Sequence, residues 1–194
     1  MNRFNITYLG VKLKSARLLF ANPRRLIRLI PYLLFNLLFK WHEEYRYETF
    51  RRVYEIASSF RFGGVDILLY GAGRIVLGEN SYIGNYSTIQ SDQGCLVQIG
   101  VGCAISHNVR IYTQTYIADQ DFGRTRDLKW GNVVIQDNVW IGANVFINPG
   151  ITIGSNSIVG ANSVVTHDVK PWSIVGGIPA RLIRMKLISK VDKA

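Results

Sequence analysis

The sequence is poor in the residues that build disulfide frameworks and metal sites. Its 194 residues include two cysteines, Cys95 and Cys103, and three histidines. The cysteines form no CxxC pair and no Cys/His spacing typical of zinc. These shortages exclude a disulfide-stapled scaffold, and we expect no metal cofactor. A reducing cytoplasm suits the two thiols.

Long hydrophobic runs are also lacking. The apolar stretch from Leu29 to Phe39 is interrupted by Pro31 and Asn36, and it is shorter than the ~20 residues that a membrane-spanning helix needs. Arg28 breaks the stretch and no small-residue cleavage site follows it, which disfavours a cleavable signal peptide. We therefore expect a cytoplasmic protein without a spanning helix.

Acidic residues are missing from the first forty positions, which hold eight Lys and Arg residues. Such an electropositive arm can face phosphate-bearing ligands, nucleic acid or an anionic membrane leaflet. Nucleic acid is not expected as a partner, because the later sequence lacks the interleaved aromatic and basic residues of RNA-binding proteins.

Residues 1–58 read as helical and amphipathic, with Asn22 and Pro23 forming a plausible N-cap and first turn. Two interpretations stay open for this segment. It forms a helical cap on the rest of the protein, or it lies on a membrane surface with arginines beside apolar side chains, namely Arg24, Arg25 and Arg28. The second interpretation predicts peripheral contact with the inner face of the membrane.

A six-residue period begins near residue 60. An aliphatic residue recurs every six positions in three unbroken blocks, at Leu77, Ile83, Ile89, Ile99, Ile105, Ile111, Ile135, Ile141, Ile147, Ile153, Val159 and Val165. Glycine often follows it, and a small or β-branched residue fills the fifth slot. A period of six is neither helical nor simple strand alternation, and it indicates a solenoid repeat.

Three such units close a triangular coil whose aliphatic side chains stack inside, while glycines relieve positive-φ or crowded turns. Complete coils are predicted at 77–94, 99–116, 135–152 and 153–170, and Val65 and Gly71 suggest an earlier one. Four extra residues interrupt the period at 95–98, and eighteen at 117–134. Because long loops on rigid scaffolds often carry function, we expect the loop 117–134 to be functional.

The pattern resembles the hexapeptide-repeat acyltransferases, in particular the galactoside, maltose, xenobiotic and capsular-sugar O-acetyltransferases. The resemblance covers roughly residues 60–186 and is carried by VWIGANVFINPGITIGSNSIVGANSVVTHDV (139–169) and GGIPARLIR (176–184). It implies a mainly β protein with a left-handed parallel β-helix over 59–175, a helical segment at 1–58 and a C-terminal tail or short helix at 176–194. It further implies a homotrimer that binds acetyl-CoA between neighbouring subunits.

Carried over by position, the resemblance implies that Trp140, Ala143, Ala161 and Thr166 line the CoA groove. Arg181 and Arg184 would meet the CoA phosphates, since guanidinium groups suit phosphate oxygens. The alternative for both arginines is a solvated helix face.

The catalytic base departs from the galactoside and maltose pattern. Those enzymes carry a histidine after the coil that precedes the long loop, in a run like IYTATHP, whereas IYTQTYIAD places Tyr116 there. A phenol is a poor general base at neutral pH. The phrase ISHNV instead resembles that of lipid A acyltransferases and sugar N-acetyltransferases. It indicates His107, in an outward-facing third slot, as the base.

A carboxylate is expected to orient this imidazole, and Asp119 and Asp121 are the nearest candidates along the chain. Asn85, Asp92 and Tyr116 are candidates for contacting the acceptor. The predicted reaction is acetyl transfer from acetyl-CoA to a hydroxyl of a cell-surface polysaccharide, lipopolysaccharide or lipid-linked oligosaccharide precursor. Two alternatives remain, an N-acetyltransferase acting on a nucleotide sugar and a catalytically inactive scaffold. A γ-class carbonic anhydrase would share the fold, but His42, His107 and His167 lie too far apart in coil register for its metal site.

Overall fold

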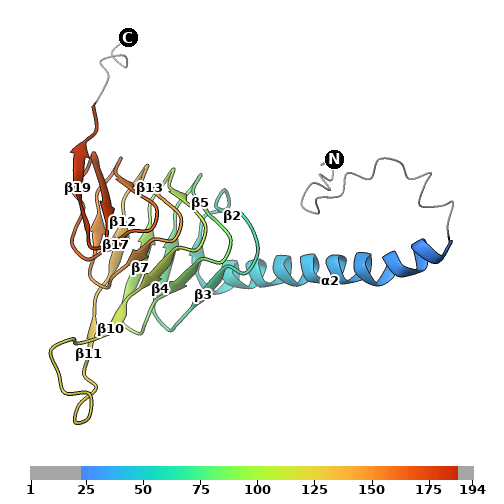
Figure 1. Ribbon diagram of the computed structural model, residues 1–194, viewed down its shortest axis with the longest axis horizontal. Coiled ribbons are helices and arrows are strands. Elements are labelled where there is room, and N and C mark those ends of the chain that lie inside the picture. The colour runs from blue at the N-terminus through green and yellow to red at the C-terminus, as the bar shows by residue number, and fades with distance from the viewer. Residues whose placement is uncertain (1–22, 188–194) are drawn as a thin grey trace. The chain divides into compact units, whose positions relative to one another are not determined.

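The protein is mainly β. The computed structural model describes residues 23–187, with side chains from residue 29 onward. Helix α2 (Pro23–Val53) comes first, and short strands follow it (Figure 1). The chain divides into two compact units, residues 1–45 and 46–194, and α2 crosses the boundary between them.

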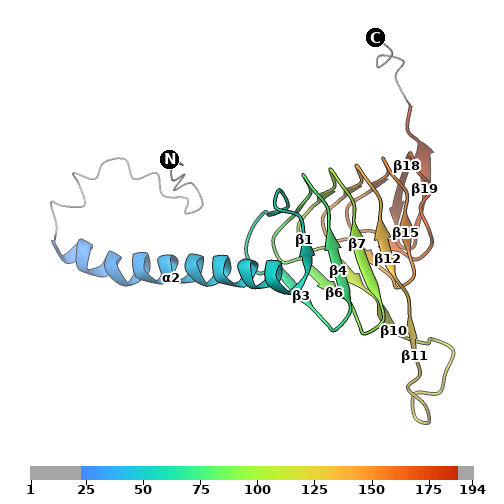
Figure 2. The same cartoon turned by 180° about the vertical axis from the view of Figure 1, so that it is seen from behind.

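Short parallel strands stack into three sheets, one on each side of a solenoid (Figure 2). Sheet A contains β1 (Glu55–Ile56), β4 (Arg74–Leu77), β7 (Leu96–Ile99), β12 (Val133–Ile135) and β15 (Thr152–Ile153). Sheet B contains β2 (Arg61–Phe62), β5 (Tyr82–Ile83), β8 (Ala104–Ile105), β13 (Trp140–Ile141), β16 (Ile158–Val159), β18 (Ser173–Gly177) and β19 (Ala180–Met185). Sheet C contains β3 (Leu68–Tyr70), β6 (Thr88–Gln90), β9 (Arg110–Tyr112), β14 (Phe146–Ile147) and β17 (Val164–Val165). Each coil runs from sheet A through B to C, which confirms the predicted parallel β-helix.

The six-residue period produces the core. All twelve aliphatic residues of the repeat are at most 1% exposed. The fifth-slot residues are equally buried, including Cys103, Val109 and Ser163. Stacked one coil above the next, these positions form one continuous hydrophobic cluster.

In the turns, asparagines and glycines have different roles, whereas the sequence predicted that glycines would serve both. Positive φ falls mainly on the fourth slot, which is usually asparagine, with φ between 55° and 60° at Asn80, Tyr86, Asn108, Asn138, Asn144, Asn156 and Asn162. Asparagine tolerates the left-handed region better than most residues. The second-slot glycines instead relieve crowding: a Cβ on Gly142 would stand 2.5 Å from the Ala161 nitrogen.

The end of α2 packs on the first coil. The Tyr47 ring stacks on Phe62 with centroids 4.5 Å apart, and its hydroxyl donates to the Gly64 carbonyl at 2.7 Å. Arg51 donates to the carbonyls of Ala57 and Phe60. Residues 46–53 therefore cover the open end of the solenoid, which starts at β1, four residues before the predicted boundary at 59.

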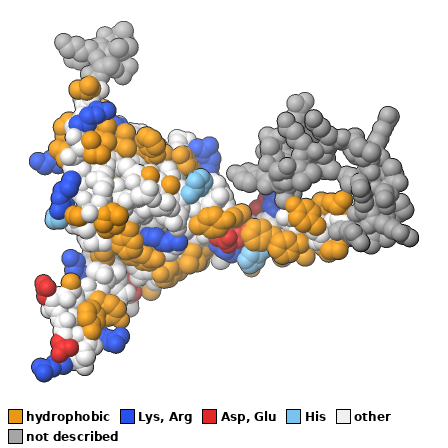
Figure 3. Space-filling view, in the orientation of Figure 1, with side chains coloured by type: hydrophobic (Ala, Val, Ile, Leu, Met, Phe, Trp, Pro, Cys, Tyr) orange, Lys and Arg blue, Asp and Glu red, His pale blue; other side chains and the backbone are white. Residues whose placement is uncertain are grey.

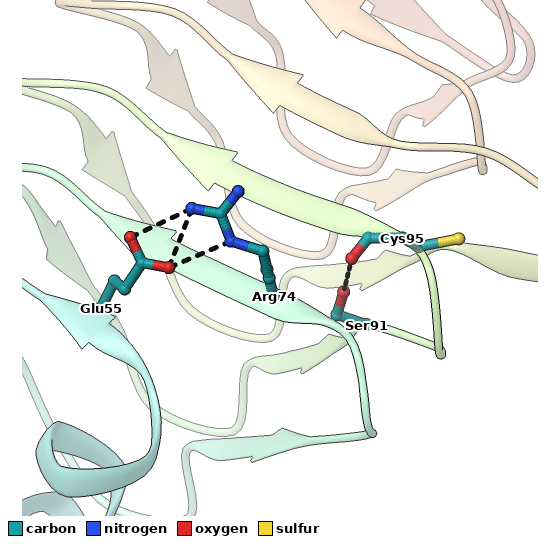
Figure 4. Close-up of polar contacts among 4 residues, drawn as sticks. All are labelled: Glu55, Arg74, Ser91 and Cys95. Atoms are coloured by element: carbon teal, nitrogen blue, oxygen red, sulfur yellow. Dashed lines mark hydrogen bonds and ion pairs between the residues drawn. The ribbon is translucent and has the colours of Figure 1, made fainter.

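The four-residue insertion is taken up by a tight turn (Figure 4). The hydroxyl of Ser91, a fully buried residue, donates to the Cys95 carbonyl at 3.1 Å, and the Cys95 N–H donates to the Asp92 carbonyl at 2.9 Å.

On neighbouring strands of sheet A, the Arg74 guanidinium binds the Glu55 carboxylate at 2.9 Å. That pair is exposed, so it contributes little to stability.

The longer insertion forms a two-stranded arm. Strands β10 (Gln114–Tyr116) and β11 (Leu128–Trp130) pair antiparallel and project from the solenoid between β9 and β12 (Figure 1). The arm leaves from the edge between sheets C and A.

The predicted helix within residues 176–194 is wrong over the described part. Residues 173–185 instead form a hairpin, in which β19 returns antiparallel along β18. Gly177, at a φ of 102°, and Pro179 form the turn, and both disfavour a helix. By pairing with β18, strand β19 satisfies backbone groups that would otherwise form an open sheet edge.

Candidate active site

One edge of the solenoid gathers the candidate residues into a column. Asn85, His107, Ala143 and Ala161 each occupy the third slot of the turn between sheets B and C, in four successive coils. Strands in register lie about 4.8 Å apart, so neighbours in this column face each other closely. We call this column the B–C edge.

His107 is exposed and is tied to the coil before it. The backbone N–H of Asn85 donates to Nδ1 of His107 at 3.1 Å. The Asn85 side chain is held from the other side, since its Oδ1 accepts the Val65 N–H at 3.0 Å. A Cβ on Gly84 would stand 2.6 Å from Nδ1, so glycine makes room for the imidazole. A neutral ring in this position carries its proton on Nε2.

An amide ladder beside this column holds the edge in register. Asn108 Nδ2 donates to Asn144 Oδ1 at 2.9 Å, and Asn144 Nδ2 donates to Asn162 Oδ1 at 2.9 Å. Each amide belongs to the residue directly after a column residue. The ladder therefore fixes the spacing between His107 and the two alanines.

The outer face of sheet B adds an aromatic and a basic side chain. Trp140 is half exposed and lies in register with Ile158 of the next coil. Continuing across the sheet, Ile158 is in register with Ile174, which pairs with Arg184. Three strand spacings separate Trp140 from Arg184, about 14 Å. Trp140, Arg184 and the two alanines of the B–C edge thus lie along one strip of the surface.

Thr166 and Arg181 lie elsewhere. Thr166 follows β17, at the edge between sheets C and A, and its hydroxyl lies 2.8 Å from His167 Nδ1. Arg181 lines a cavity of about 380 Å³, together with His167 and Lys170. Within a single chain, sheet C separates Thr166 from Ala143 and Ala161.

The cavity suits an anion. Its polar lining comes from Arg181, Lys170, His167, Ser173 and Asp168, so basic side chains outnumber the single carboxylate. The Asp168 carboxylate accepts the Thr152 N–H at 2.7 Å. Lys170 carried no signal in the sequence beyond its charge, because only the hairpin brings it to Arg181.

The candidate carboxylates of the arm lie on a different edge from His107. His107 stands between β8 and β9, whereas Asp119 and Asp121 follow β10. The Asp121 carboxylate stabilises its own turn, accepting the Gly123 N–H at 2.9 Å and pairing with Arg124 at 3.2 Å. One chain therefore does not join His107 to these groups.

Asp92 and Tyr116 stabilise the arm in this structure. Asp92 Oδ2 accepts the Trp130 indole N–H at 2.8 Å, which anchors the base of β11. The Tyr116 ring packs edge-on against Phe122, with centroids 5.6 Å apart. Gln120, which the sequence did not single out, bonds to backbone on both sides of the arm tip, at Ile117 and Asp127.

No group of three or more His, Cys, Asp or Glu side chains within residues 23–187 is placed to hold a metal ion. The solenoid thus combines an exposed edge histidine with a projecting two-stranded arm. A family model described as bacterial transferase hexapeptide (six repeats) matches residues 132–167.

Solved structures give the same result. A hexapeptide-repeat acetyltransferase of Vibrio cholerae O1 biovar eltor, complexed with acetyl coenzyme A, is 31% identical over 74% of this chain and 77% of its own, with a TM-score of 0.62. A maltose O-acetyltransferase from Clostridium difficile 630 is 30% identical over 76% of this chain and 88% of its own, with a TM-score of 0.53. The chain belongs to the hexapeptide-repeat acetyltransferases and is an acyltransferase.

The fold is shared more widely. An N-acyltransferase from Bacillus cereus, in complex with dTDP and 3-hydroxybutyryl-CoA, is 20% identical over 72% of this chain and 88% of its own, with a TM-score of 0.57. At this identity the likeness concerns the fold, and it does not choose between oxygen and nitrogen as the acceptor atom.

Proposed function

We propose that the protein transfers an acetyl group from acetyl-CoA to a hydroxyl group of a saccharide, with His107 as the general base. The observation that carries this proposal is the exposed His107 on the B–C edge of an acetyltransferase solenoid, with small residues in the two coils above it. The acceptor class is a cell-surface polysaccharide, lipopolysaccharide or lipid-linked oligosaccharide precursor.

The donor fits the strip beside His107. Ala143 and Ala161 leave the backbone accessible for the amides of a pantetheine arm, and Trp140 offers an apolar surface. Arg184, at the far end, and Arg181, in the cavity, are suited to phosphate oxygens. The positions of Thr166 and the alanines on different edges support a donor groove between two subunits of a homotrimer.

His107 would take the proton of the acceptor hydroxyl as its oxygen attacks the thioester carbonyl. The carbon–sulfur bond then breaks, and the proton passes to the leaving thiolate to give CoA. Taking the proton at Nε2 requires the ring to carry its own proton on Nδ1, so the Asn85 N–H bond must open when substrates bind. General-base catalysis of this kind contributes typically ~10²–10⁴-fold.

Asp119 or Asp121 would orient the imidazole only from the arm of a neighbouring subunit. Asp119 is favoured, because the Asp121 carboxylate already holds its own turn and Arg124. Asn85, Asp92 and Tyr116 remain candidates for binding the acceptor. Asp92 would have to exchange its bond to Trp130 for one to a sugar hydroxyl.

The location is part of the proposal. Acetyl-CoA as donor and two cysteines outside any disulfide suit a reducing cytoplasm. A lipid-linked acceptor would bring the reaction to the inner face of the membrane, which suits the basic and apolar segment 1–58.

The test is acetyl transfer by the purified full-length protein with radiolabelled acetyl-CoA. Oligosaccharides and amino nucleotide sugars are offered in parallel. Products are separated from the remaining acetyl-CoA and treated with alkaline hydroxylamine, which cleaves O-acetyl esters and leaves amides. The proposal expects hydroxylamine-sensitive product, lost in His107→Ala and kept in His42→Gln, which changes a histidine on α2.

Two other outcomes would replace the proposal. Hydroxylamine-resistant product on amino sugars would identify an N-acetyltransferase, the second candidate, which the ISHNV phrase favours. Acetyl-CoA binding without CoA release for any acceptor, and without any effect of His107→Ala, would indicate an inactive scaffold.

A further inference from the structure

Helix α2 exposes a large apolar surface within residues 30–45. The side chains of Phe35, Leu37 and Trp41 are about two-thirds exposed, at 65%, 66% and 64%. Figure 3 shows hydrophobic side chains along this part of the helix. The other exposed members are Ile30, Tyr32, Leu33, Leu34, Leu38 and Tyr45. Exposed apolar surface on this scale usually marks an interaction site.

Within residues 30–41 the polar side chains Asn36 and Lys40 form one narrow line, and His42, Glu43 and Glu44 follow them. Asn36, Lys40 and Glu44 are spaced by four, and Lys40 pairs with Glu44 at 3.6 Å. At about 100° per residue, the exposed apolar side chains from Ile30 to Trp41 spread over roughly 260° of the helix circumference. Residues 30–41 thus present one polar stripe and are apolar elsewhere, a distribution that suits immersion in an apolar medium.

The geometry of this apolar surface disfavours two arrangements, a helix that spans a bilayer and a coiled coil with helices of other copies. In residues 23–187 no helix is both long and apolar enough to cross a bilayer, and the run Leu29–Phe39 is only about 16 Å long, against ~30 Å of hydrocarbon. Helices of other copies in a coiled coil would need a narrow heptad seam. The wide, aromatic-rich arc and Pro31 inside the helix do not fit one.

Charge points to an anionic surface. Residues 1–40 contain eight basic residues and no acidic ones. Three of the arginines, Arg24, Arg25 and Arg28, fall in the first two turns of α2, although their side chains lie outside the described part. Each basic residue near an anionic leaflet adds attraction, and aromatic residues such as Tyr32 and Trp41 favour the boundary between headgroups and hydrocarbon.

We propose that residues 24–41 bind in the plane of an anionic phospholipid membrane, with the apolar arc in the headgroup boundary and the Asn36–Lys40 line facing water. This interaction is independent of the acetyl-transfer proposal, because it depends on no residue of the B–C edge. It would hold the enzyme at the surface where a lipid-linked acceptor resides.

The test is flotation of the full-length protein with vesicles of phosphatidylcholine alone or mixed with phosphatidylglycerol. Flotation with the anionic vesicles is expected at low salt. Leu34→Gln with Leu38→Gln should weaken that binding roughly a hundredfold, since each buried leucine contributes substantially. The matched control on the polar line, Asn36→Gln with Lys40→Gln, should change binding by less than about tenfold.

A charge variant separates the electrostatic part. Arg24, Arg25 and Arg28 changed together to Gln should weaken anionic-vesicle binding on the order of a hundredfold at low salt, and by less at high salt. Circular dichroism and melting curves establish that each variant is folded.

Four results would overturn the proposal. Three of them are no flotation of the wild-type protein with anionic vesicles, equal flotation of the leucine variant, and equal binding to vesicles with and without phosphatidylglycerol. A fourth is dissociation of the oligomer by the leucine substitutions with vesicle binding unchanged, which would identify a second copy of the chain as the occupant.

Discussion

The backbone N–H of Asn85 donates to Nδ1 of His107, so one coil of the solenoid determines the tautomer of the imidazole in the next. The same contact explains Gly84, because any side chain there would meet the ring. In the resting enzyme the neutral ring therefore offers an N–H at Nε2. It becomes a proton acceptor at that atom only when the contact opens.

The tautomer of His107 is directly measurable. With neutral imidazole, nitrogen-detected NMR should show the protonated nitrogen of His107 to be Nε2 in the ligand-free protein. After addition of CoA and acceptor the proton should move to Nδ1. An Nδ1–H form in the free protein would contradict the hydrogen bond, and His107→Ala assigns the signals.

The two arginines should contribute to donor binding. Arg181→Gln and Arg184→Gln should each raise the KM for acetyl-CoA by roughly 10–100-fold, as expected for loss of a hydrogen bond to a charged group. The value of kcat with saturating donor should change little. Repeating the assay with dephospho-CoA thioester identifies the arginine that meets the 3′-phosphate, since that variant loses its effect. An unchanged KM in both variants would mean that they face solvent.

Two second-slot glycines form a matched pair for stability. A Cβ on Gly142 would stand 2.5 Å from the Ala161 nitrogen, whereas a Cβ on Gly160 would make an ordinary contact of 3.4 Å with the Val175 carbonyl. Gly142→Ala should lower the free energy of unfolding by about 1–3 kcal/mol, as overpacking does. Gly160→Ala should change it much less. Urea denaturation measures both, and equal losses would contradict the crowding argument.

The carboxylates of the arm can be distinguished by amide substitution. Asp119→Asn should lower kcat and leave the melting temperature unchanged if Asp119 orients His107 of a neighbouring subunit. Asp121→Asn can still accept from Gly123 but loses its charge on Arg124, so it should change both quantities little. A large loss of kcat in Asp121→Asn with a normal Asp119→Asn would reverse the assignment.

The buried thiol of Cys103 should be unreactive. Burial raises the pKa of this thiol, and its Sγ donates to the Gln136 carbonyl at 3.0 Å. The thiolate, which is the reactive form, is thus suppressed in the folded protein at pH values where an exposed cysteine begins to ionise. The protonated thiol stabilises the folded state fully at pH values below the ordinary thiol pKa. This stabilisation is lost as pH rises through the raised pKa of Cys103 in the folded protein. Iodoacetamide labelling followed by mass spectrometry should modify Cys103 only after unfolding in urea, with Cys103→Ser identifying the peptide.

The core was predictable because slot and burial are tied by geometry. Once three short strands close a coil, the first and fifth slots must point inward, so Ile105 and Cys103 are buried and His107 is outside. The insertion at 117–134 was visible as a break in the period, but its antiparallel pairing of Gln114 with Trp130 was not.

Other features depend on contacts that spacing does not encode. His107 Nδ1 accepts a hydrogen bond from the Asn85 N–H of the previous coil, which the hexapeptide spacing does not predict. Likewise, the spacing does not predict that the Asp121 carboxylate accepts the Gly123 N–H within its own turn. The segment around Arg181 and Arg184 is rich in residues that tolerate a helix, so the prediction failed there. Only the unpaired edge of β18 makes the strand preferable.

The order of strands in sheet B sets the distance between His107 and the C-terminal hairpin. From β8, which precedes His107, to β18, the sheet passes through β13 and β16. These three steps set about 14 Å between β8 and the hairpin. Distance along the solenoid changes only in whole coils, so the spacing between His107 and the hairpin can vary only in steps of about 4.8 Å. Excising residues 135–152, one complete coil, would bring His107 about 4.8 Å closer to the hairpin and would remove Trp140 and Ala143 from the strip between them.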